Sequence, residues 1–140
     1  MPDNLTLTYE FTNDPDDDFG WLQVSAEGKG FAGTAGFWVQ WQDVSEWAAK
    51  LDTYPLPSSG IEEEWGYTEE GTYHRVIYIG LRQSTPNGRV AVRLGLRNYN
   101  DVSAHAEVSF ETVYSRLAEF KTEVEQLVAR NSERATLLGD

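Results

Sequence analysis

Near the start of the chain, apolar and polar side chains alternate with a period of two, which is the pattern of a half-buried strand. In residues 5–11 the apolar positions are Leu5, Leu7, Tyr9 and Phe11, and they are separated by Thr6, Thr8 and Glu10. Similar segments follow at 20–27 and 31–41, and the glycines of Gly28-Lys29-Gly30 favour a hairpin between them. We therefore expect three strands, with an acidic loop over residues 13–18 after the first.

Two later segments repeat their apolar residues every three or four positions, as amphipathic helices do. The short one places Val44, Trp47, Ala48 and Leu51 on one stripe, with Asp43 or Ser45 as a candidate N-cap and with Pro55 and Pro57 ending it. The long one runs to about Arg130, and its stripe holds Val113, Leu117, Phe120, Val124, Leu127 and Val128. Residues beyond Asn131 are expected to fray.

Between these helices, strand patterns occur at 61–67, 75–82, 89–98 and 104–110. Asn87-Gly88 is the strongest short hairpin signal in the chain and is expected to join the second and third of them. No repeat or linker divides the 140 residues, so a single domain over 1–140 is the simplest interpretation. The predicted class is α+β: a single antiparallel sheet of about six or seven strands, packed by the long C-terminal helix and the short mid-chain helix.

The amino-acid composition excludes several classes of function. The chain has no cysteine, which excludes disulfides, thiolate metal sites and a cysteine nucleophile. The first residues lack the basic and apolar regions of a secretion signal, and no apolar run approaches the roughly 20 residues that a membrane-spanning helix needs. We therefore expect a soluble, cytoplasmic protein without a membrane segment.

The negative charge is concentrated in the first half of the chain. Residues 1–70 hold fifteen Asp and Glu against Lys29 and Lys50, which gives −13, whereas residues 71–140 hold eight acids and nine bases, which gives +1 and a total of −12. Such a field repels nucleic acid and anionic membranes and favours a basic protein partner, although it also serves solubility. The candidate partner-binding residues are Asp14, Asp16, Asp17, Asp18, Trp21, Glu62, Glu63 and Glu64.

Two segments match known binding motifs, but the residues around them do not fit the structure that each motif requires. Residues 28–33 satisfy G-x-G-x-x-G, but a strand pattern follows where a dinucleotide site needs the start of a helix. The spacing of Asp14, Asp16 and Asp18 suits a calcium loop, but Phe19 and Ser25 stand where an EF-hand needs glycine and glutamate. No cofactor or metal site is therefore predicted, and the glycines are assigned to a hairpin.

The remaining candidates each have a structural alternative. Arg89, Arg93 and Arg97 share one face of a predicted strand and could form an anion site, or could pair across strands with carboxylates such as Glu62, Glu64 or Glu107. The tryptophans Trp38, Trp41, Trp47 and Trp65 could line a ligand cavity, but core packing is their commoner use. His74 and His105 are the only histidines and belong to no catalytic motif, so no catalytic residue is predicted.

The order of several segments resembles the WapI-type bacterial immunity proteins. The segments are 20–24 (GWLQV), 44–47 (VSEW), 62–64 (EEE), the strands around 76–81 and 90–96, and 108–112 (VSFET) leading into Leu117 and Phe120. The resemblance implies a cytosolic protein that binds and neutralises a toxin, often a nuclease, without catalysis. The sequence thus suggests a non-enzymatic domain that binds a basic protein, such as a toxin domain. The alternatives are a module for a small anionic or aromatic ligand and an enzyme with a dispersed site, and the oligomeric state stays open.

Overall fold

The computed structural model describes residues 2–86 and 88–140, and these residues form an α+β fold. The elements follow in the order β1 (Asn4–Phe11), β2 (Phe19–Gly28), β3 (Phe31–Gln40), α1 (Trp41–Ala48), β4 (Ile61–Glu69), β5 (Thr72–Gln83), β6 (Arg89–Asn98), β7 (Asp101–Val113), α2 (Tyr114–Val128) and β8 (Ala135–Leu138). The predicted class is confirmed.

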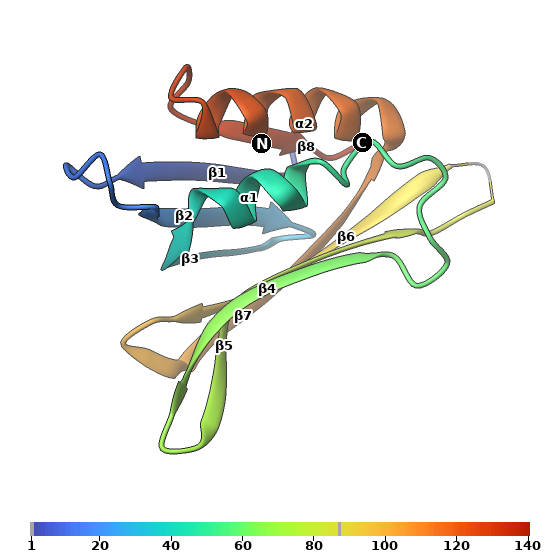
Figure 1. Cartoon of the computed structure of the whole chain (residues 1–140). Coiled ribbons are helices and arrows are strands. Elements are labelled where there is room, and N and C mark those ends of the chain that lie inside the picture. Colours follow the sequence, from blue (N-terminus) through green and yellow to red (C-terminus); the bar gives the residue numbers. More distant parts are fainter. Residues whose placement is uncertain (1, 87) are drawn as a thin grey trace.

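The prediction of one continuous sheet is wrong, because the strands form two antiparallel sheets of four. The first has the order β3-β2-β1-β8 and the second the order β4-β5-β6-β7. The strands of the two sheets run in clearly different directions, and β3 packs across β6 and β7 (Figure 1). A period of two shows that each strand has one apolar face, but it does not show whether that face meets a helix or another sheet, so the alternation could not separate the two arrangements.

The segment expected to fray contains the last strand. Residues 135–138 form β8, which pairs antiparallel with β1. Ala135 lies opposite Leu7, and Leu137 lies opposite Leu5. Both Ala135 and Leu137 are fully buried, and the Thr136 amide donates to Glu123 Oε1 on α2 at 3.0 Å. The strand therefore forms because its two alternating apolar side chains complete the core beneath α2.

The start of the short helix also differs from the prediction. Helix α1 begins at Trp41, its N-cap is Gln40, and neither Asp43 nor Ser45 caps it. The Trp41 amide instead donates to the carbonyl of Asp18 at 3.0 Å, so the acidic loop satisfies one of the free N–H groups at the helix start. Asp43 lies in the first turn, where a negative charge is favourable to the helix dipole.

One apolar core lies between the two sheets and the two helices. Both helices contact each other and the first sheet, α1 through β3 and α2 through β1 and β8 (Figure 1). Trp47 of α1 is at its centre, edge-on to Trp65 of β4 and to Phe120 of α2. The predicted helix stripes are largely confirmed, since Val44, Trp47, Ala48, Leu51, Leu117, Phe120, Val124 and Leu127 are all buried.

The connection between β5 and β6 spans residues 84–88. The two strands pair antiparallel as expected, and Gly88 has a positive φ of 94°. Asn87, the first residue of the predicted Asn-Gly turn, lies outside the described residues.

Candidate functional site

The acidic loop between β1 and β2 is held by its own side chains. The Asp14 carboxylate accepts from the Asp16 amide and the Asp17 carboxylate from the Phe19 amide, each at 2.9 Å. Asp14, Asp16 and Asp18 are exposed, while Asp17 is half-buried. Within residues 2–86 and 88–140, no group of three or more His, Asp or Glu is arranged to hold a metal ion.

The loop continues into an aromatic surface on the first sheet. Phe19 and Trp21 alternate along β2, and the register places Trp21 between Glu10 of β1 and Trp38 of β3. These four side chains therefore share the face that points away from the core. Phe19 is 45% exposed and Trp38 is 47% exposed. We call this surface the aromatic–acidic face: Glu10, Asp14, Asp16, Asp17, Asp18, Phe19, Trp21 and Trp38.

Close packing over a glycine fixes the orientation of Trp21. A Cβ atom on Gly36 would lie 2.4 Å from the Trp21 ring, so the indole lies directly over this glycine. It meets Trp38 edge-on at 5.2 Å between ring centroids and Tyr99 at 6.1 Å. Trp21 is thus half-buried and rigid, while the more exposed Trp38, for which core packing was favoured, forms the open edge of the pair.

A shallow depression of about 510 Å3 lies beside this pair of indoles. Its lining residues are Glu10, Phe11, Thr12, Asn13, Trp21 and Trp38. The arrangement offers a partner a hollow with aromatic rings on one side and polar side chains, including a carboxylate, on the other, which suits the aliphatic stem and charged head of a lysine or arginine.

The pKa of Tyr9 is shifted by burial and by the negative charge of the acidic loop. Burial, followed by the negative charges of Asp17, Asp18 and Asp43, raises the pKa of Tyr9 to about 12. The Tyr9 hydroxyl donates to the carbonyl of Val39 at 2.6 Å. Three carboxylates, two from the loop and one from the start of α1, therefore act on the same region.

We expect the free energy of unfolding to fall as the pH rises from 10 to 12. The pKa of Tyr9 is raised in the folded state, so its contribution is complete below the unfolded value of 10.0 and is lost as the pH approaches about 12. Two pKa units correspond to about 3 kcal/mol at most. Urea denaturation at a series of pH values should show this decline in the parent and a shallower one in Tyr9→Phe. Parallel curves for the two proteins would contradict it.

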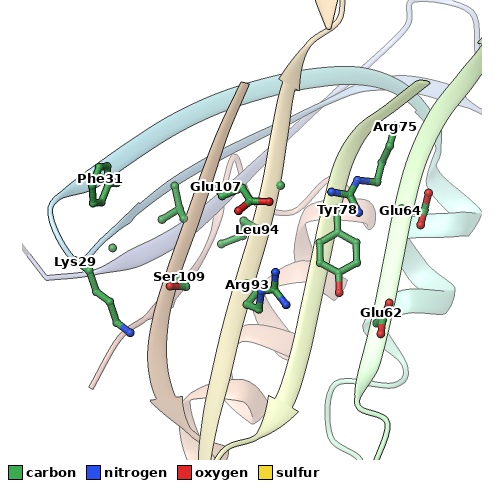
Figure 2. A pocket seen from close by; sticks show the side chains of 13 residues that line it. Lys29, Phe31, Glu62, Glu64, Arg75, Tyr78, Arg93, Leu94, Glu107 and Ser109 are labelled. Carbon is green, nitrogen blue, oxygen red and sulfur yellow. The ribbon is translucent and has the colours of Figure 1, made fainter. Parts of the chain in front are cut away.

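The acidic run of β4 does not belong to the aromatic–acidic face. Glu62, Glu63 and Glu64 lie on the edge strand of the second sheet, and alternation turns Glu62 and Glu64 to its outer side. There they line a cleft of about 520 Å3 that also contains Arg75, Tyr78 and Arg93 (Figure 2). The carboxylates of the first seventy residues are thus divided between two surfaces.

Arg75 enters the cleft because of a β-bulge. Trp65 of β4 pairs with Ile77, but the next residue, Gly66, pairs with Arg75, so Val76 is an extra residue on β5. Val76 and Ile77 are both fully buried, and the alternation of β5 is therefore shifted at this point. A Cβ atom on Gly66 would lie 2.1 Å from the His74 carbonyl, so the close approach at the bulge needs glycine.

Tyr78 joins the two arginines of the cleft. The Arg75 guanidinium lies over its ring at 4.5 Å from the centroid. Burial raises the pKa of the Tyr78 hydroxyl, and so do the charge of the neighbouring Glu62 carboxylate and hydrogen bonding to it.

The predicted arginine row is divided by its surroundings. Arg89 forms ion pairs with Asp140 at 3.3 Å and with Glu111 at 3.8 Å, so its guanidinium already has carboxylate partners. Arg97 is half-buried opposite His105 and does not line the cleft. Of the three, Arg93 alone lines the cleft, and the other arginine there is Arg75, which is not among the residues predicted from the sequence.

The two histidines lie on different strands. His74 of β5 packs beside Tyr67 at 5.2 Å between ring centroids. His105 of β7 is exposed, and its Nδ1 lies 3.0 Å from the Ser103 carbonyl.

Comparison of the chain with family models and with curated proteins finds no match. The resemblance to immunity proteins therefore stays a hypothesis. None of the described helices is long and apolar enough to cross a bilayer.

Proposed function

We propose that this chain is a non-enzymatic protein-binding domain that binds a basic protein through the aromatic–acidic face. One observation carries the proposal: exposed aromatic side chains on one sheet directly adjoin a run of carboxylates in the β1–β2 loop, where Asp18 precedes Phe19. Phe19 and Trp38 supply the aromatic surface, and the loop over residues 14–18 supplies the charge.

The aromatic part fits the chemistry of protein interfaces. A few large side chains, tryptophan above all, carry most of the binding energy when a partner covers them. Trp38 is half exposed, and it is held by Trp21, which is itself fixed over Gly36. A partner that covers Trp38 therefore gains apolar contact area while ordering few side chains, which keeps the entropic cost of binding low.

The charged part selects a basic partner. Between residues 1 and 49 the chain has nine Asp and Glu and a single basic residue, Lys29, which lies at the far end of the β2–β3 hairpin. Glu10 and the four Asp of the loop thus have no lysine or arginine of this segment beside them; the basic side chain at this end of β1 comes from Arg130, which lies over the Phe11 ring at 3.8 Å from its centroid. Complementary charge of this kind accelerates association and disfavours acidic partners.

The most specific form of the proposal is a toxin-neutralising immunity protein. The resemblance to the WapI type and the acidic docking face both support it, since a nuclease toxin contacts the phosphates of nucleic acid through a surface of lysine and arginine. The first test is the reading frame next to this one in the source genome. A secreted protein with a C-terminal toxin domain is expected there, and co-expression of this chain should rescue cells from that domain. A neighbouring toxin that kills cells despite co-expression contradicts the immunity function.

The contribution of the face is tested with two exposed aromatic residues of the same strand. Trp38→Ala is expected to weaken binding of the toxin domain by about 2 kcal/mol or more, which is roughly 30-fold, as measured by calorimetry. Phe31→Ala is the matched control, because Phe31 is 70% exposed on β3 but lies outside the face. Equal affinities of the two variants would show that the partner binds elsewhere.

A further inference from the structure

We propose that the cleft on the outer side of the second sheet binds a small zwitterion of the amino-acid type, with an apolar or aromatic side chain. Its carboxylate would lie between Arg75 and Arg93, and its ammonium group would face the surrounding glutamates (Figure 2). This site is separate from the aromatic–acidic face and does not depend on the function proposed for that face.

The two guanidinium groups are available for a ligand. Among residues 2–86 and 88–140, the ion pairs involve Arg89 and Lys121, and neither Arg75 nor Arg93 has a carboxylate oxygen within 4.0 Å. Each guanidinium has five N–H donors in a planar fork that matches a carboxylate. Arg75 is half-buried and oriented by the Tyr78 ring, so part of the ordering cost of binding is already met by the fold.

One glycine lines the floor of the cleft, and a second lines the adjoining hollow. Gly95 of β6 is in the cleft and Gly80 of β5 is in the hollow, and neither adds a side chain to this side of the sheet. A Cβ atom on Gly95 would lie 2.9 Å from Arg75 Nη2, and one on Gly80 would lie 2.5 Å from the Tyr78 hydroxyl oxygen. The arginine and the tyrosine therefore lie low across the sheet, and space is left above them.

The surrounding charges favour a zwitterion over a simple anion. The cleft is lined by three cationic side chains, Lys29, Arg75 and Arg93, and by three carboxylates, Glu62, Glu64 and Glu107, which gives a formal charge of 3 − 3 = 0. A phosphate dianion would meet the two arginines but also three carboxylates without compensation. A ligand with one negative and one positive group satisfies both sets.

A wall at one side of the cleft supplies the apolar contact. The tip of the β2–β3 hairpin brings Lys29 and Phe31 to the β7 edge, and Phe31 is 70% exposed there (Figure 2). The hairpin is firmly seated, because a Cβ atom on Gly28 would lie 2.2 Å from the Ser109 carbonyl oxygen. An exposed aromatic ring beside paired charges suits a ligand with an apolar or aromatic side chain.

The test is a titration of the full chain with L-phenylalanine, followed by calorimetry and by amide chemical shifts. Saturable binding with a millimolar or lower dissociation constant is expected, with shifts at the cleft. 3-Phenylpropionate, phenethylamine and inorganic phosphate each lack one part of the recognised chemistry and should bind at least tenfold more weakly. Absence of saturable binding by L-phenylalanine, or stronger binding of phosphate, overturns the proposal.

Substitutions then locate the site. Arg75→Met and Arg93→Met should each weaken L-phenylalanine binding roughly tenfold to a hundredfold, the usual effect of losing charge-assisted hydrogen bonds. Gly95→Ala should also weaken it, by displacing the Arg75 guanidinium while leaving the fold intact. Arg97→Met is the matched control on the same strand and should bind like the parent. Unchanged affinity in both arginine variants of the cleft overturns the proposal. Binding of the toxin domain is read separately, so the two proposals can fail independently.

Discussion

Replacing Trp47 with alanine is expected to lower the free energy of unfolding by about 3–5 kcal/mol, the usual range for loss of a buried tryptophan. Trp47 is 1% exposed and meets Trp65 and Phe120 edge-on, at 6.5 Å and 5.9 Å between ring centroids. Its side chain therefore packs between α1, the second sheet and α2. Its removal leaves a cavity bordered by all three elements. Urea denaturation followed by circular dichroism measures the change.

Trp38→Ala provides the matched control for this stability experiment. Trp38 is 47% exposed, and its ring contact is the edge-on pair with Trp21, so a loss of about 1 kcal/mol is expected. The two variants should thus be affected in opposite ways, with Trp47→Ala losing stability and Trp38→Ala losing partner binding. Equal destabilisation by both substitutions would show that the aromatic–acidic face is structural.

Changing Asp14, Asp16, Asp17 and Asp18 together to asparagine is expected to slow association with a basic partner by roughly 10- to 1,000-fold at low salt. Asparagine keeps the side-chain oxygens that accept from the amides of Asp16 and Phe19, so the loop can retain its conformation. A slower association rate in this variant therefore measures the effect of the lost charge and not of a changed loop conformation. Stopped-flow or surface-based kinetics at several salt concentrations measure the association rate, and the variant should also show a weaker salt dependence.

The control for the loop variant removes the same charge from other surfaces. Glu69, Glu70, Glu119 and Glu123 lie at the β4–β5 turn and on α2, away from the aromatic–acidic face, and are changed to glutamine. If this variant slows association as much as the loop variant does, the net charge of the protein and not the loop steers the partner. Unchanged association in the loop variant would contradict steering by the loop.

The local sequence patterns predicted most of the helices and strands, but they did not predict how the strands assemble into sheets. The stripes of α1 and α2 are specific because a period of 3.6 residues fixes which side chains are buried. Strand alternation fixes only one face, which is why the division into two sheets was missed. The four residues of β8 fall in the segment predicted to fray, because a strand that short carries little periodic signal until its partner β1 is known.

The candidate sites show the same limit. Strict alternation places Arg75 on the same side as Ile77 and Ile79, and only the extra residue Val76 turns it outward. The adjacent apolar residues Val76 and Ile77, together with Gly66 on the facing strand, are the signals that could have indicated the bulge. Trp38 could not be recognised as exposed, because an apolar side chain on an outer face gives the same alternation as one on an inner face.

Binding through the aromatic–acidic face is tested most directly by amide hydrogen exchange of this chain with and without a basic partner protein, the proposed toxin domain. New protection is expected in residues 10–21 and 36–41, the loop and strand ends that carry the aromatic–acidic face. Protection confined to β4–β7 or to the exposed side of α2, with no change in those two segments, would contradict it.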